Sequence, residues 1–201
     1  MYIELNSSLA LEQAGEQDLD ECLGIIEEVS GGLLPFLLEP LDVRSALSLV
    51  AEQNSLFSGE NMYVLKEKSR PGIRALLFAY RNHYQLPAIV STMMSQSKYE
   101  LLCKVVLPRT EDSFYINTLY VAHSVRNLGL ARLLLDVARI MAGEQGCRDI
   151  CLHCFNDQQH ALNLYFSCGY QLIEQISYFG ELAQLHPRGG SILSCRLQAP
   201  E

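Results

Sequence analysis

The sequence predicts a single domain of the α/β (mixed α+β) class, with helices packed on the faces of a sheet. Strand-type and helix-type segments alternate along the second half of the chain, and this order produces at least one parallel strand–helix–strand unit. No internal repeat and no linker rich in Pro, Gly or Ser divides the chain. With 201 residues, 49% of them hydrophobic, the chain can bury one core. We therefore expect one domain over residues 1–201.

The first quarter of the chain is predicted to form an extended segment, Leu9–Gln13, and two helices. The first helix is indicated by apolar residues that recur at the spacing of one helix face, and it ends at Gly31-Gly32. These residues are Leu19, Cys22, Leu23 and Ile26. The second helix begins at Asp42 as its N-cap and continues through Val50.

The middle of the chain is predicted to contain a strand hairpin and an insertion. Strands at Asn61–Lys66 and Ile73–Arg81 flank a turn at Ser69-Arg70-Pro71-Gly72. The span Leu86–Asp112 fits the alternating pattern less well, with one helix at Tyr99–Val106, and we interpret it as an insertion. It either folds over a substrate channel or serves as scaffold or dimer contact, and the sequence leaves these alternatives open.

The second half is predicted to alternate strands and helices to the end. The segments are a strand at Phe114–Val121, a helix with Leu130, Leu133, Leu134, Val137, Ala138 and Met141 on its apolar face and Gly143 and Gly146 at its end, a strand at Asp149–Phe155, a helix at Gln159–Ser167, and strands at Tyr170–Ser177 and Ile192–Leu197. The last two strands are expected to pair as a long hairpin.

Composition argues against several classes of protein. The formal charge is -8 and Lys and Arg form no run, so we expect no nucleic-acid binding, whereas an amine or other cationic substrate is compatible with this charge. No stretch approaches the ~18 consecutive apolar residues of a membrane-spanning helix, and Met1-Tyr2-Ile3-Glu4 does not resemble a secretory signal. The seven cysteines are an odd number in apolar segments, which favours reduced thiols. We expect a cytoplasmic protein without structural disulfides.

The junction between the strand ending at Val121 and the following helix is the strongest candidate site. The first turn of a helix has backbone N–H groups without internal partners and carries partial positive charge, so it can bind a diphosphate. Gly129 lets the main chain approach closely, Ala131 adds little bulk, and Arg126 and Arg132 can bond phosphate oxygens. The alternative is a solvated helix start with an ordinary turn glycine, since the three-glycine dinucleotide signature is missing.

Two segments in order resemble motifs of the GNAT acetyltransferases. Arg126-Asn127-Leu128-Gly129-Leu130-Ala131 resembles the pyrophosphate motif Q/R-x-x-G-x-G/A, and Leu119-Tyr120-Val121 is similar to the strand that ends at it. Further on, the segment Ala161–Tyr170 resembles A-x-x-L-Y-x-x-x-G-F/Y. The resemblance is specific from about Phe114 to Ile176. It implies a central mixed, mostly antiparallel sheet with helices on both faces and a parallel strand pair splayed at the cofactor site.

The resemblance also implies which residues bind acetyl-CoA. The strand end takes the pantetheine arm as though it were an added strand, and the turn takes the pyrophosphate. The implied cofactor-binding residues are Leu119, Tyr120, Val121, Arg126, Asn127, Leu128, Gly129, Leu130, Ala131, Arg132 and Gln158. The chain departs from the family pattern at three positions, with His123 for a frequent Pro, Ala131 for a frequent Gly and Gln158 for the usual Asn.

The resemblance assigns the catalytic acid but not the base. Tyr165 matches the position whose phenol protonates the departing thiolate, although a buried Tyr that only fills the core is the alternative. Relatives often carry Glu or Asp on the strand before the turn, where this chain has Asn117 and Thr118. Glu111 and Asp112 could act through water, or they belong to a solvated loop.

Cys151, His153 and Cys154 superficially suggest a metal or thiol site. Alternation along a strand sends Cys151 and His153 to one face and Cys154 to the other, which disfavours shared chelation. A Cys–His nucleophile pair would lack a third group to orient the imidazole. We therefore interpret the three as buried neutral residues and expect no metal.

The sequence thus favours an enzyme that transfers an acetyl group, or another small acyl group, from acetyl-CoA directly to a primary amine. The acceptor is a small molecule or a peptide, and a homodimer is compatible with the sequence. One alternative is a catalytically weak or inactive acyl-CoA-binding sensor of the same fold, suggested by Asn117 and Thr118. Another is a structural partner whose cleft has collapsed, suggested by His123 and Ala131.

Overall fold

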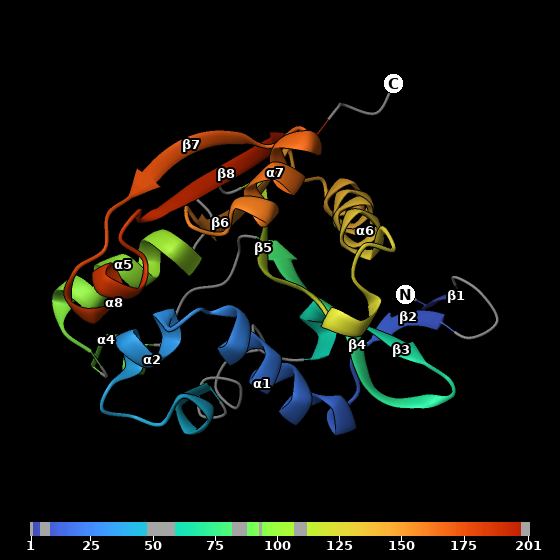
Figure 1. Ribbon diagram of the computed structural model, residues 1–201, viewed down its shortest axis with the longest axis horizontal. Helices are drawn as coiled ribbons and strands as arrows, with labels where there is room; N and C mark the ends of the chain where they lie inside the picture. Colours follow the sequence, from blue (N-terminus) through green and yellow to red (C-terminus); the bar gives the residue numbers. More distant parts are fainter. Residues whose placement is uncertain are drawn as a thin grey trace.

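Strands from the whole chain form one sheet in the computed structural model, which describes residues 2–4, 9–47, 59–81, 88–92, 94–106 and 112–197. Within these ranges the sheet has eight strands, in the order β1-β2-β3-β4-β5-β6-β8-β7 (Figure 1). The strands are β1 (Tyr2–Glu4), β2 (Leu9–Gln13), β3 (Met62–Glu67), β4 (Arg70–Arg81), β5 (Ser113–Val121), β6 (Asp149–Phe155), β7 (Gln171–Ile176) and β8 (Gly190–Arg196). The helices are α1 (Leu19–Val29), α2 (Leu33–Leu38), α4 (Ala88–Thr92), α5 (Gln96–Val106), α6 (Leu130–Glu144), α7 (Gln159–Ser167) and α8 (Gly180–Leu185), with single turns η1 (Glu16–Asp18), η3 (Gly59–Asn61) and η4 (His123–Val125).

The sheet is antiparallel except between β5 and β6. These two strands are parallel because α6 connects them as a crossover over one face. The next unit does not repeat this arrangement, since β8 lies between β6 and β7 and pairs antiparallel with both. The predicted mixed, mostly antiparallel sheet with one parallel strand pair is confirmed.

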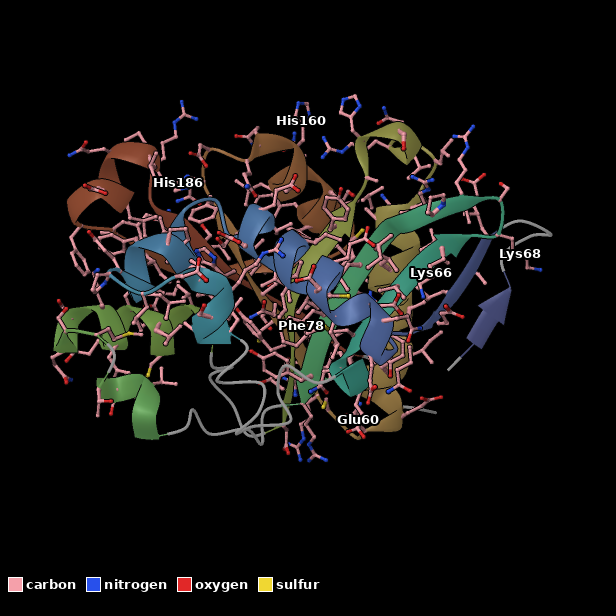
Figure 2. All side chains as sticks on the ribbon, turned by 90° about the horizontal axis from the view of Figure 1, so that it is seen from below. Glu60, Lys66, Lys68, Phe78, His160 and His186 are labelled. Carbon is pink, nitrogen blue, oxygen red and sulfur yellow. The ribbon has the colours of Figure 1, made fainter. Side chains whose placement is uncertain are left out.

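Helices cover both faces of the sheet, and each face has its own hydrophobic core. On one face, α1, α2, α5 and α8 pack around side chains such as Phe78, which is fully buried beneath α1 (Figure 2). On the other face, α6 and α7 pack around side chains such as Phe114 and Leu134. The two amphipathic patterns of the sequence explain this: α1 buries Cys22 and Ile26 with their neighbours, and α6 buries its own apolar stripe.

The strands β5 and β6 part at the centre of the sheet. Their parallel pairing runs only from Ser113 to Ile116 on β5. The register with β4 shifts at the same place: Ile116 lies opposite Ala79 and Thr118 opposite Phe78, so Asn117 is an extra, bulged residue. A β-bulge bends its strand and increases its local twist. The bulge therefore coincides with the point where β5 leaves β6, which produces the predicted splay.

Most predicted elements are present, and several boundaries match the sequence analysis. Leu9–Gln13, Asp149–Phe155 and Gln159–Ser167 form the strands and helix expected of them. The predicted helix at Asp42 is present over residues 43–47, and the Asp42 carboxylate accepts the N–H of Ser45 at 2.8 Å as an N-cap. Its predicted continuation lies outside the described residues.

Three expectations about elements were wrong or incomplete, although α6 does end at Glu144, between the two glycines expected to close it. The strand β4 begins at Arg70, inside the predicted turn. The helices α2 and α8 and the short strand β1 were not predicted. The described part of the predicted insertion contains the helices α4 and α5, and α5 contributes Leu101 and Val105 to the core. All seven cysteines are free thiols, and no helix in the described ranges combines the length and apolarity needed to cross a bilayer.

Candidate active site

A cavity of about 140 Å³ opens where β5 and β6 part. Strand and α7 residues form one side of it, and apolar residues of α1, α2 and α5 form the other. The strand side and α7 provide Tyr115, Ile116, Asn117, Thr118, Leu119, Leu152, His153, Cys154, Phe155, Gln158, Ala161 and Tyr165, and the helices with the loop between α1 and α2 provide Ile26, Val29, Ser30, Leu33, Leu34 and Val105. The predicted site residues Leu119, Gln158 and Tyr165 therefore line one cavity.

The turn before α6 exposes a row of backbone N–H groups. Asn127 and Gly129 both have left-handed φ values, 62° and 78°, which turn the chain sharply into the helix. Within the described part of the chain, the amides from Asn127 to Arg132 donate to no backbone oxygen, and the first helical bond runs from Leu133 to Gly129. A Cβ on Gly129 would meet no atom within 4 Å, so the space beside this turn is open. The turn thus fits a diphosphate.

Side chains anchor this turn at both ends. Arg126 is exposed, and its Nε donates to the carbonyl oxygen of Val121 at 3.1 Å. Arg132 is also exposed, and its Nη2 donates to the Ser167 hydroxyl of α7 at 3.0 Å. Both guanidinium groups therefore lie at the surface near the open amides, where they can contact phosphate oxygens.

The other predicted cofactor-binding residues differ in how far their side chains are exposed to solvent. Leu128 is 67% exposed, whereas Leu130 is 8% exposed and packs in the core under α6. Leu130 can therefore contribute only its backbone to a ligand. Tyr120 and Val121 are partly buried at the end of β5, and β4 pairs with them on one edge only. Among the described strands, none pairs with the edge facing β6 there, which suits an added extended ligand.

Tyr165 places its phenol in the cavity from the buried face of α7. It is 8% exposed, and its ring contacts Tyr170 edge to face at 5.7 Å between centroids. Burial raises the pKa of Tyr165, so the phenol keeps its proton throughout the neutral range. No residue in the described ranges hydrogen-bonds its hydroxyl. Gln158, at the N-cap of the same helix, is exposed and is held by a bond from its N–H to the Phe155 carbonyl at 3.1 Å.

The acidic residues suggested as bases do not converge on the cavity. Asp112 precedes β5 at the end opposite the turn and lies 3.8 Å from Arg81 and 3.5 Å from Arg148. Glu111 lies outside the described residues. In the cavity itself, Thr118 donates to the Asn117 side-chain oxygen at 3.0 Å. No carboxylate lines the cavity among the described residues.

The strand β6 alternates as predicted. Cys151 faces the core beneath α1, whereas Cys154 faces the core beneath α6. Burial raises the pKa of Cys154 to about 12, so this thiol stays protonated. His153 lies on the Cys151 side, with its Nε2 at 2.6 Å from the Tyr178 hydroxyl. The described residues contain no group of three His, Cys, Asp or Glu side chains arranged to hold a metal ion.

A second histidine, His186, packs against one residue of the cavity wall. The Nδ1 of His186 lies 2.8 Å from an Asp157 oxygen, and its Nε2 lies 2.6 Å from the carbonyl oxygen of Gly31. Its ring stacks on Phe155, which lines the cavity, at 3.7 Å between centroids. Figure 2 shows His186 beside α2 and α8. Sequence reasoning did not find this contact, because it joins segments 155 residues apart.

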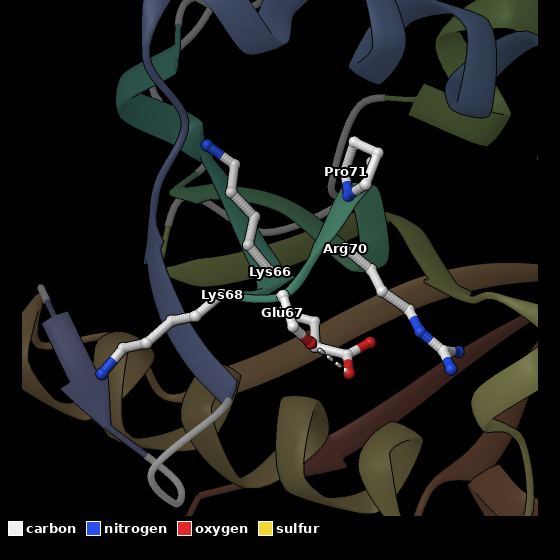
Figure 3. Close-up of a pocket in the computed structure, with 7 residues that line it drawn as sticks. Lys66, Glu67, Lys68, Arg70 and Pro71 are labelled. Atoms are coloured by element: carbon white, nitrogen blue, oxygen red, sulfur yellow. Dashed lines mark hydrogen bonds between the residues drawn. The ribbon is translucent and has the colours of Figure 1, made fainter.

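Another hollow, of about 360 Å³, lies over the hairpin between β3 and β4. Figure 3 shows the side chains of Lys66, Lys68 and Arg70 pointing away from one another there. Lys66 is paired with Asp18 at 2.7 Å, and Ser69 bonds Glu67 at 3.1 Å. Charges that diverge and are partly neutralised do not form a binding site, so the cavity between β5 and β6 is the candidate.

Comparison with known proteins agrees with this geometry. The family model described as Acetyltransferase (GNAT) family matches residues 52–170. The structure is similar to spermidine N-acetyltransferase from Vibrio cholerae in complex with CoA and spermine, with 14% identity, a TM-score of 0.60 and coverage of 95% of this chain and 96% of that chain. It is also similar to ribosomal-protein-S18-alanine N-acetyltransferase from Escherichia coli, with 14% identity, a TM-score of 0.56 and coverage of 96% of each chain. A third similar structure is Ard1 from Thermoplasma volcanium, with 12% identity, a TM-score of 0.59 and coverage of 95% of this chain and 99% of that chain.

At these identities the similarity to solved structures shows the fold. No curated protein sequence matches this chain significantly. The family model, however, spans more than half of the 201 residues and includes the turn before α6 and the whole of α7. The resemblance found in the sequence is thereby confirmed, and the chain belongs to the GNAT acetyltransferase family.

Proposed function

We propose that this protein is an acyl-CoA-dependent N-acyltransferase that moves an acetyl group from acetyl-CoA to a primary amine by direct attack. The observation that carries the proposal is the row of amides from Asn127 to Arg132, which donate to no backbone oxygen of the described residues and lie beside the splayed end of β5. This row lies at the N-terminus of a helix of 15 residues, where the helix dipole favours an anion. The fold supports the same conclusion, since CoA-bound acetyltransferases share it.

In this proposal the chain holds acetyl-CoA by main chain and few side chains. The amides of the turn bind the diphosphate, with Arg126 and Arg132 adding charge-assisted bonds. Leu119, Tyr120 and Val121 bond the pantetheine arm along the free edge of β5, and Gln158 contacts it from α7. The thioester then lies in the cavity between β5 and β6, within reach of Tyr165, which supplies the proton that the CoA thiolate needs.

The acceptor amine enters from the side formed by α1, α2 and α5. Similar structures carry amines of different kinds, including spermine in one case and a peptide in the NatC complex bound to Gag peptide and CoA. A small-molecule or peptide amine is therefore the acceptor class we propose. A second candidate function, an acyl-CoA-binding module without turnover, is favoured by one observation: Asn117 occupies the bulge, and no carboxylate lines the described cavity.

The test is calorimetric titration with acetyl-CoA of the natural protein and of two glutamate variants. Gly129→Glu places a carboxylate where the diphosphate is expected, so the affinity should fall at least about tenfold. Gly146→Glu is the matched control, because Gly146 also has a positive φ, also has open space beside it and lies at the other end of α6. Equal binding by both variants, or no binding by the natural protein, would contradict the proposal.

A further inference from the structure

The transfer reaction needs a group that takes a proton from the attacking amine. Of the described side chains that line the cavity, only His153 is a free nitrogen base. The neighbouring candidates are excluded by their chemistry, since Asn117 and Gln158 are amides and the Cys154 thiol keeps its proton. The imidazole comes from β6, on the strand that parts from β5 at the cavity.

The protein holds this imidazole in a fixed position. The Tyr178 hydroxyl, from the segment between β7 and α8, lies 2.6 Å from His153 Nε2. The ring of Phe155 packs edge to face against both rings, at 5.1 Å from His153 and 5.7 Å from Tyr178. No residue in the described ranges hydrogen-bonds His153 Nδ1. One ring nitrogen is therefore occupied and the other is available.

Gly190 of β8 provides the space for this pair. A Cβ at this position would lie 2.5 Å from His153 Nε2 and would also overlap the Tyr178 hydroxyl. Any other residue at position 190 would therefore push the two side chains apart. The backbone of Gly190 has no positive φ, so the glycine is required by the close approach and not by its conformation.

The surroundings keep the imidazole neutral. Burial, and then the charge of His186, lower the pKa of His153 to about 4. Among the described residues, the titratable groups nearby include the Tyr178 phenol, which is bonded to Nε2, and the buried Tyr115 phenol and Cys151 thiol. His186 is in turn paired with Asp157. The α1 and α2 residues at the cavity carry no titratable side chain. His153 is therefore unprotonated at every pH near neutrality, so the lone pair on Nδ1 is present.

Resting on the proposed function, we infer that His153 is the general base of the acyl transfer and that Tyr178 is its positioning residue. The amine nitrogen forms a bond to the thioester carbonyl carbon, which makes that nitrogen cationic and more acidic. His153 Nδ1 takes one proton from it, while Tyr178 accepts the Nε2–H bond. The C–S bond then breaks, and Tyr165 protonates the thiolate. The products are the amide and CoA, and no net proton is released, because the proton that His153 gives up to solvent is matched by the proton that Tyr165 regains.

The first test does not depend on the acceptor. NMR of the full chain labelled with ¹⁵N-histidine reports which ring nitrogen carries the proton. The inference expects His153 as the Nε2–H tautomer, with Nδ1 unprotonated, from pH 8 to about pH 5. Tyr178→Phe should change this tautomer balance. A dominant Nδ1–H tautomer, or an imidazolium at pH 7, would overturn the inference.

The second test measures acetyl transfer to hydroxylamine, a small amine that is largely neutral at pH 7. His153→Gln should lower kcat/KM about 10²-fold, as expected for loss of a general base. Binding of acetyl-CoA should stay within about twofold. Gly190→Ala and Tyr178→Phe should give smaller losses, because they leave the imidazole present but misplaced. His160→Gln is the control, since His160 is exposed on α7 (Figure 2).

The pH profile separates catalysis from packing. When the rate is divided by the neutral fraction of hydroxylamine, kcat/KM of the natural protein should fall as the pH drops through about 4, because a protonated His153 cannot accept. The His153→Gln profile should lack this fall. If the natural protein does not bind acetyl-CoA or does not transfer its acetyl group, the proposed function fails. If it does both and His153→Gln is equally active, only the inference about His153 fails.

Discussion

Replacing Tyr165 with Phe is expected to lower kcat about 10³-fold with any amine that the natural protein acetylates. The phenol lies in the cavity where β5 and β6 part, and burial keeps it protonated. Loss of a positioned proton donor typically costs 10²–10⁴-fold, because the thiolate must then leave unprotonated. The ring remains, so its contact with Tyr170 and the packing of α7 should survive. Acetyl-CoA affinity and the free energy of unfolding should change little.

Tyr170 supplies the matched control for this experiment. It is 2% exposed, it touches the Tyr165 ring, and its hydroxyl has no hydrogen-bond partner in the described part of the structure, but it does not line the cavity. Removing a buried hydroxyl without a partner should be neutral or slightly stabilising. Tyr170→Phe should therefore keep its activity. Steady-state kinetics of both variants decide the point, and equal activity of both would assign Tyr165 a packing role only.

The turn and the two flanking elements could be predicted from the sequence because their signals are local. The segment Phe114–Met141 contains all of these signals: a strand, a glycine at the start of the next helix, and apolar residues three and four apart that form one face of that helix. The same is true of α7 and its Tyr165. Local patterns of this kind do not depend on what lies across the sheet, so the structure reproduces them.

The rest of the site depends on contacts that are distant in the sequence. The bulge at Asn117 is a shift in the register between β4 and β5, and the sequence of β5 alone does not predict it. Tyr178 and Gly190 matter through their approach to His153, which is 25 residues from Tyr178 in the chain. The helix α2 was missed because Gly31-Gly32 is also typical of a helix end, whereas Gly32, with its positive φ, is the N-cap of α2, which begins at Leu33.

The substitution with the largest expected effect on stability is Phe78→Ala. Phe78 is fully buried on β4, beneath α1 and opposite Thr118, the residue after the bulge of β5, and it contacts Tyr80 at 5.4 Å between ring centroids. Deleting a buried aromatic ring removes its transfer free energy and leaves a cavity, which costs about 3–5 kcal/mol. Chemical denaturation should show this loss. Phe166→Ala, at a side chain 48% exposed on α7, should change the free energy of unfolding by only about 0.5 kcal/mol.

The number of unfolding transitions of the Phe78→Ala variant tests whether the chain forms one cooperative domain. Phe78 belongs to the core beneath α1, whereas α6 and α7 cover a separate core on the other face, and the same strands form the floor of both. If residues 1–201 make one cooperative domain, Phe78→Ala should shift a single transition, seen alike by far-UV circular dichroism and by tyrosine fluorescence from both faces. Two separate transitions would show that the layers unfold independently. The single-domain expectation would then be wrong, because a shared sheet should make each face lose its packing when the other does.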